Sequence, residues 1–130
     1  RLVMLVRDGR EVALSMFNKG WMPTIRECME RWGTFTAMTV SAIGRSPEDR
    51  VVLIRYEELV KDFSATITRV FDFLRLPKPD PDLVAKSNAP GIAPQPDRLG
   101  RWRDQIAVED ARWFAKRYGP LMEDLGYRLD

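Results

Sequence analysis

The stretch that decides the fold is residues 1–17, RLVMLVRDGREVALSMF. Its run at 2–6 is short and entirely apolar, which is typical of a parallel strand covered by helices on both faces. Asp8, followed three residues later by Glu11, forms a capping-box-like pair that predicts a helix continuing to about Phe17. The segment therefore predicts a strand, a tight turn and a helix. Because the chain opens directly on a strand, we expect further sequence upstream.

The next part of the chain predicts one long helix and a second strand. Pro23 suits the first position of an amphipathic helix whose apolar positions extend to Val40 and which ends at Gly44. Residues 51–54 then predict a second buried strand. The order strand, helix, helix, strand indicates the α/β class, with a parallel sheet joined by crossovers. The length favours one domain over residues 1–130.

The last third alternates helices with a proline-rich loop. Apolar spacing predicts a helix from Ala65, and six prolines within 77–100 predict a surface loop, apart from a short helix near 83–86. A final helical stripe begins at Val108, with a kink or restart at Pro120.

Composition excludes several function classes. The formal charge is only +2, so a bulk electrostatic grip on nucleic acid is not indicated. The absence of histidine excludes imidazole zinc sites and Ser-His or Cys-His nucleophile pairs within this sequence. A single cysteine, Cys28, fits a reducing compartment, and no apolar run approaches the roughly 20 residues of a membrane span. We expect a cytoplasmic protein without a membrane span.

The first candidate site joins Arg7 and Ser15. Arg7 stands at the carboxyl end of the first strand, where ligands bind in parallel α/β sheets. Ser15 lies about 10 Å along the helix axis from Asp8, so a guanidinium and a hydroxyl could converge on one phosphate. Two structural alternatives stay open: Arg7 could pair with a carboxylate, and Ser15 could bond the carbonyl of Glu11.

Two further candidates follow later. Tyr56 comes at the end of the second strand, where simple packing is an equal alternative. In residues 98–106, RLGRWRDQI, Gly100 allows a backbone amide to approach an anion, and Arg98 and Arg101 can add charge-assisted hydrogen bonds. The alternative is a solvated basic loop with Trp102 as a core anchor.

These segments resemble, in order, motifs of sulfotransferases that use 3′-phosphoadenosine 5′-phosphosulfate (PAPS). LVRDGREVALSMF is similar to the family's 3′-phosphate-binding element, with Gly9 where proline is common and Glu11 where aspartate is common. VLIRYEELVKDFSATITRVFDFLRLP resembles a strand of the family with its Tyr-Glu-(Asp/Glu)-Leu turn and the following helix, with Arg75 in place of the usual glycine. RLGRWRDQI resembles the late loop through Gly100 and Trp102, and LMEDLGY is also favoured near the family's end.

The resemblance implies a three-layer α/β/α parallel sheet of the P-loop nucleotide-kinase-like type, of which this chain is a C-terminal fragment. It implies transfer of a sulfuryl group from PAPS, without a metal, to an acceptor hydroxyl or amine on a small molecule, carbohydrate or lipid. The residues that it assigns to PAPS are Arg7, Ser15, Tyr56, Arg98, Gly100 and Arg101. Arg7 and Ser15 would hold the 3′-phosphate, and Tyr56 would lie near the adenine.

The family's phosphosulfate loop, a glycine-rich turn that carries a lysine, has no counterpart in this sequence. We therefore expect this portion to be an incomplete enzyme that does not catalyse transfer alone, and no catalytic base is assigned. One alternative is a non-catalytic remnant or assembly module that binds no nucleotide. Another is a P-loop kinase relative, for which a magnesium-binding Ser/Thr and Asp motif is missing. The sequence does not decide whether the protein forms a homo-oligomer.

Overall fold

The computed structural model describes residues 1–80, 82 and 99–129. The short helix expected near 83–86, and most of the loop expected over 77–100, lie outside these residues. The chain divides into two compact units, which are described separately. The first comprises the described residues of Arg1–Val6 and Ser46–Leu99, and the second those of Arg7–Arg45 and Gly100–Asp130.

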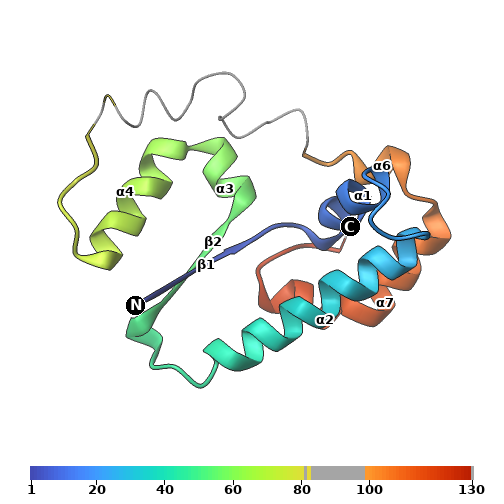
Figure 1. Cartoon of the computed structure of the whole chain (residues 1–130), viewed down its shortest axis with the longest axis horizontal. Helices are drawn as coiled ribbons and strands as arrows, with labels where there is room; N and C mark the ends of the chain where they lie inside the picture. Colours follow the sequence, from blue (N-terminus) through green and yellow to red (C-terminus); the bar gives the residue numbers. More distant parts are fainter. Residues whose placement is uncertain (81, 83–98, 130) are drawn as a thin grey trace. The chain divides into compact units, whose positions relative to one another are not determined.

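The first unit contains the parallel strand pair that the sequence predicts. Strand β1 (Leu2–Val6) pairs with β2 (Val51–Arg55), in a register that runs from Leu2 opposite Val51 to Val6 opposite Arg55 (Figure 1). A short 3₁₀ turn, η1 (Glu48–Arg50), leads into β2. Since the strands are parallel and in register, their carboxyl ends share one edge. The structure is thus a small α/β fold with a two-stranded parallel sheet and several helices.

The expected burial of both strands is only partly right. Val6 and Ile54 are buried, but Leu2 and Leu5 are 52% and 58% exposed. In this unit the main helix contacts with the sheet are made to β2. The described helices therefore leave the outer residues of β1 uncovered, although an all-apolar strand predicts cover on both faces.

Two helices follow β2 where the sequence predicts one. Helix α3 (Tyr56–Lys61) is followed by α4 (Phe63–Leu74), which begins two residues before the predicted start. Asp62 caps α4 by accepting a hydrogen bond from the backbone N–H of Ala65 at 2.9 Å. Helix α4 ends at Arg75, whose φ of 59° lies in the left-handed region that favours glycine.

The second unit packs four helices: α1 (Gly9–Asn18), α2 (Ile25–Ile43), α6 (Trp102–Gln105) and α7 (Val108–Asp124) (Figure 1). The prediction that α2 starts at Pro23 is wrong. Thr24 is the cap, because its hydroxyl accepts from the N–H of Glu27 at 3.2 Å while the Glu27 carboxylate accepts from the N–H of Thr24 at 3.0 Å. Helix α7 also continues through Pro120, so the expected restart there is not observed.

Close helix packing builds the core of this unit. The ring of Trp32 on α2 lies 5.4 Å from that of Phe114 and 6.2 Å from that of Tyr118, both on α7. A Cβ on Gly33 would stand 2.1 Å from the Tyr118 ring, and one on Gly9 would stand 2.6 Å from Trp32. Glycine at position 9 therefore lets α1 approach the core. Within residues 1–80, 82 and 99–129, no helix has the length and hydrophobicity needed to cross a bilayer.

Candidate functional site

The start of α1 is held by an aspartate cap and an ion pair. Asp8 Oδ1 accepts from the N–H of Arg10 at 2.9 Å, and the Asp8 carboxylate also binds the Arg10 guanidinium, with contacts of 3.0 and 2.7 Å. Arg10 further donates to the carbonyl of Arg128 at 3.0 Å and stacks 3.7 Å from the centre of the Trp102 ring. Asp8 is thus the predicted cap, but its carboxylate bonds Arg10 and not Glu11 at the third helical position, so the predicted capping box does not form.

Glu11 is the centre of the candidate site. Its side chain is 2% exposed. Its Oε1 accepts a hydrogen bond from the backbone N–H of Trp102 at 3.1 Å. Its Oε2 lies 3.4 Å from Nη2 of Arg7 and 3.9 Å from Nε of Arg101. Because a buried carboxylate is costly without partners, these contacts explain how the charge is accommodated.

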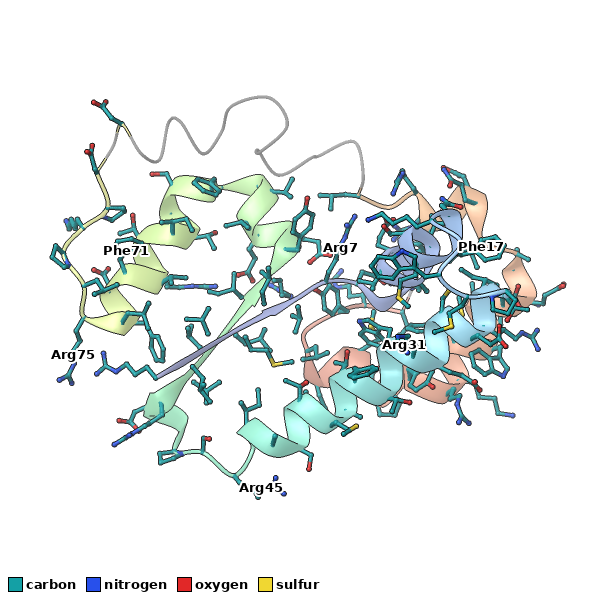
Figure 2. All side chains as sticks on the ribbon, in the orientation of Figure 1. Arg7, Phe17, Arg31, Arg45, Phe71 and Arg75 are labelled. Atoms are coloured by element: carbon teal, nitrogen blue, oxygen red, sulfur yellow. The ribbon has the colours of Figure 1, made fainter. Side chains whose placement is uncertain are left out.

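Two of the arginines that the sequence predicts for the site therefore meet at one carboxylate, and the alternative in which Arg7 pairs with a carboxylate is observed. The Arg7 side chain is 20% exposed and the Arg101 side chain 32%, so both reach solvent from a largely buried base. Figure 2 labels Arg7 where the chain enters α1. Among the described residues, the buried Nε of Arg101 has no hydrogen-bond acceptor. The two guanidinium groups thus share one carboxylate oxygen as a common neighbour.

Ser15 lies on the same face of α1 as Glu11. The two residues are four positions apart, which makes them neighbours on a helix surface. Ser15 is half-buried. In the part of the chain that the structure describes, the Ser15 hydroxyl does not bond the Glu11 carbonyl, which was the structural alternative. Arg7, Glu11 and Ser15 thus follow one another at intervals of four residues.

Gly100 forms the turn that delivers Arg101. Its φ of 79° is a left-handed conformation that suits glycine, and its carbonyl accepts from the N–H of Arg103 at 3.1 Å. Trp102 follows as the first residue of α6 and is 8% exposed, with the Arg103 guanidinium 4.6 Å from its ring centre. The burial of Trp102 agrees with the alternative that the sequence leaves open, in which Trp102 is a core anchor. A role of its neighbours in binding is a separate question.

Two predicted residues remain, Tyr56 and Arg98. Tyr56 is the half-buried first residue of α3 in the first unit. Close by, Glu58 binds Arg55 at 2.6 Å and Arg69 at 2.8 Å. Burial raises the pKa of Glu58, but the hydrogen bonds from the two arginines outweigh it, so this pKa lies below its ordinary value. Arg98 lies outside the described residues.

A groove of about 360 Å³ opens beside Trp102 in the second unit. Its basic and apolar lining includes Arg10, Arg103 and Arg112, with Ile106. Arg7, Ser15 and Arg101 are not among the lining residues. The groove therefore neighbours the cluster around Glu11 without containing it.

The role of Glu11 is the functional feature that sequence reasoning missed. The sequence patterns assign Glu11 only to the cap of the helix and to a position where the resembled family commonly has aspartate. Its four-residue spacing from Arg7 is a signal for an ion pair. Its bond to Trp102 has no local signal, because the two residues are 91 positions apart.

Comparison with known proteins bears on these segments. The model of a protein family described as the sulfotransferase family matches residues 1–80, which include Arg7, Glu11, Ser15 and Tyr56. No curated protein and no solved structure matches the chain. The family match covers more than half of the sequence, and it is the family that the first two of these segments resemble. The chain belongs to the sulfotransferase family.

Proposed function

We propose that this chain is part of a sulfotransferase that uses PAPS as donor, and that it supplies the binding site for the 3′-phosphate. PAPS provides the sulfuryl group that passes to an acceptor hydroxyl or amine. Membership of the sulfotransferase family supports sulfuryl transfer in general. The observation that carries the finer proposal is the convergence of Arg7 and Arg101 on Glu11.

The charge balance of this cluster suits a phosphate monoester. Such a group carries a charge of about −1.5 to −2 at neutral pH. Arg7 and Arg101 bring two guanidinium groups to one place, and both side chains reach solvent. Charge-assisted hydrogen bonds from guanidinium groups contribute about 1.5–3 kcal/mol each. The cluster can therefore distinguish a nucleotide with a 3′-phosphate from one without it.

The other assigned residues complete the proposed site. Ser15, on the Glu11 face of α1, donates its hydroxyl to the same phosphate. Gly100 holds the turn that presents Arg101, and its positive φ explains the glycine. The family resemblance adds Tyr56 beside the adenine and Arg98 in the late loop.

The same resemblance supports a proposal for the whole domain. We assign residues 1–130 to the C-terminal portion of one three-layer α/β/α domain of the P-loop nucleotide-kinase-like type. The parallel pair of β1 and β2 supports this, since parallel strands joined by helices are typical of such a sheet. The acceptor is proposed to be a small molecule, carbohydrate or lipid.

Calorimetry of the full-length protein with 3′-phosphoadenosine 5′-phosphate (PAP) tests the phosphate site. Because Arg7→Ala removes one charge-assisted contact, the Kd should rise by about tenfold to a hundredfold. Arg45→Ala removes the same charge from an exposed position and should leave the Kd within about twofold. An unchanged Kd for Arg7→Ala would remove Arg7 from the site.

A further inference from the structure

We infer that Glu11 is a positioning residue for nucleotide selectivity: its carboxylate holds Arg7 and Arg101 at the spacing that one 3′-phosphate requires. The inference rests on the proposed function. It adds an acidic residue, which does not contact the ligand, to a site otherwise made of cationic and hydroxyl groups. The test below separates failure of the inference from failure of the site itself.

The two carboxylate oxygens of Glu11 have different partners. Oε1 fixes the backbone at Trp102 through a 3.1 Å hydrogen bond, and so fixes where Arg101 leaves the turn. Oε2 faces the guanidinium groups of Arg7 and Arg101 at 3.4 and 3.9 Å. One oxygen thus anchors the backbone while the other orients the two cations.

Burial makes this arrangement rigid. The Glu11 side chain is 2% exposed, and it lies on α1 at a point where Gly9 packs tightly against Trp32 and Phe114. A long, solvated ion pair would change its geometry freely, but a buried carboxylate with fixed partners cannot. The arginines are therefore preorganised before a ligand arrives, which lowers the cost of ordering them on binding.

Replacing Glu11 by glutamine removes the charge of the side chain but keeps its hydrogen bond to the backbone. The carbonyl oxygen of a glutamine can still accept from the N–H of Trp102. Its NH₂ group is a donor, however, and would face the donors of Arg7 and Arg101. Glu11→Gln therefore keeps the fold contact and repels the two guanidinium groups from their positions.

The sign of the effect distinguishes positioning from simple neutralisation. If Glu11 only offset positive charge, its removal would strengthen anion binding, because a carboxylate repels phosphate. If Glu11 positions Arg7 and Arg101, its neutralisation weakens binding of the 3′-phosphate in particular. The two roles predict opposite changes in the same Kd.

The experiment is calorimetry of the full-length protein with PAP and with adenosine 5′-phosphate, which lacks the 3′-phosphate. For Glu11→Gln we expect the Kd for PAP to rise about tenfold, the equivalent of losing one charge-assisted contact. The Kd for adenosine 5′-phosphate should stay within about twofold, since that ligand has no group at the cluster. Glu30→Gln, at an exposed position of α2, is the matched control and should change neither value.

Kinetics and a conservative variant provide further readouts. In the active enzyme Glu11→Gln should raise the KM for PAPS and leave kcat nearly unchanged, because the effect is on donor binding. Glu11→Asp keeps the charge but is shorter by one methylene, so it should retain the preference for PAP within about threefold and lower the Tm.

The outcomes are distinct. Unchanged or tighter PAP binding by Glu11→Gln, with Arg7→Ala still impaired, would overturn the positioning role and leave the proposed site intact. A preference lost equally in Glu11→Asp and Glu11→Gln would also overturn it, because the role depends on the charge. If Arg7→Ala binds PAP normally, the proposed site fails and the inference fails with it.

Discussion

The carboxylate of Glu11 accepts a hydrogen bond from the backbone N–H of Trp102 at 3.1 Å, and so joins α1 to α6 across 91 positions of sequence. The same side chain contacts Arg7 at its other oxygen. A residue that is local to the first helix thus determines where a much later arginine, Arg101, is presented. This relationship has consequences for stability as well as for binding.

Glu11→Ala should destabilise the protein strongly. The change leaves the N–H of Trp102 without its acceptor and removes the carboxylate beside two guanidinium groups. Breaking one partner of a buried ion pair costs about 3–5 kcal/mol. Urea denaturation of the full-length protein measures the change, with Glu30→Ala as the control on an exposed helix surface. A loss below about 1 kcal/mol would show that the contacts of Glu11 contribute little.

Gly33→Ala should also destabilise, although alanine is the better helix former. In an exposed helix the change would stabilise by about 1 kcal/mol. Here the added Cβ would stand 2.1 Å from the Tyr118 ring, so α2 and α7 must separate, at a cost of about 1–3 kcal/mol. Thermal unfolding tests the sign. Thr34→Ala, at the exposed neighbouring position, should have no destabilising effect. A higher Tm for Gly33→Ala would contradict the close packing.

Arg75→Gly should stabilise the end of α4. Arg75 has a φ of 59°, a left-handed conformation that costs a residue with a Cβ roughly 1 kcal/mol. Glycine relieves this strain, which accounts for its use at this position in the sequences that the segment resembles. Arg75→Ala removes the same charge and keeps the strain, so it should bring no such gain. Equal unfolding free energies for the two variants would show that the backbone conformation is not the cause.

Glu58 should contribute to stability only above acidic pH. Its pKa is lowered from 4.5 because bonds from Arg55 and Arg69 outweigh the effect of burial. A carboxyl group whose pKa is lower in the folded state stabilises it above the unfolded pKa, and this stabilisation is lost as the pH falls through the folded value.

The variant Glu58→Gln should therefore be less stable than the parent at pH 7 and should approach it below about pH 4. The Glu58 side chain is 31% exposed, so the difference should be under about 1 kcal/mol. Denaturant titrations at the two pH values measure it. A stability gap that stays the same at both values would exclude the ion pair as its cause.

Local sequence signals explain which elements were predictable. The apolar run at 2–6 predicts β1, and the cap at Asp8 predicts α1. Both patterns are contained within a few residues of sequence. The predicted start of α2 is wrong because Pro23 suits a first helical position, whereas the Thr24–Glu27 capping box satisfies two backbone N–H groups reciprocally and starts the helix after Thr24. Proline favours a kink or restart at Pro120, but one helix of 17 residues contains it.

In the candidate site too, local patterns predict some features and tertiary packing decides the others. The position at the end of the first strand predicts Arg7 as a candidate site residue, and helical spacing predicts Ser15. Glycine in a turn gave Gly100, which the left-handed φ explains. Sequence spacing does not predict that Glu11 contacts Arg7 and Arg101 together, because the contact with Arg101 depends on how distant segments pack.

The most direct test of the account is a double-mutant cycle on Arg7 and Arg101, measured by calorimetry of the full-length protein with PAP and with adenosine 5′-phosphate. Because both guanidinium groups are proposed to bind one phosphate, each single alanine variant should lose PAP affinity about tenfold or more. The double variant should lose less than the sum of the two free-energy changes. Adenosine 5′-phosphate should bind all four proteins alike. PAP affinities that are unchanged, or that fall in parallel with those for adenosine 5′-phosphate, would contradict a 3′-phosphate site at Arg7 and Arg101.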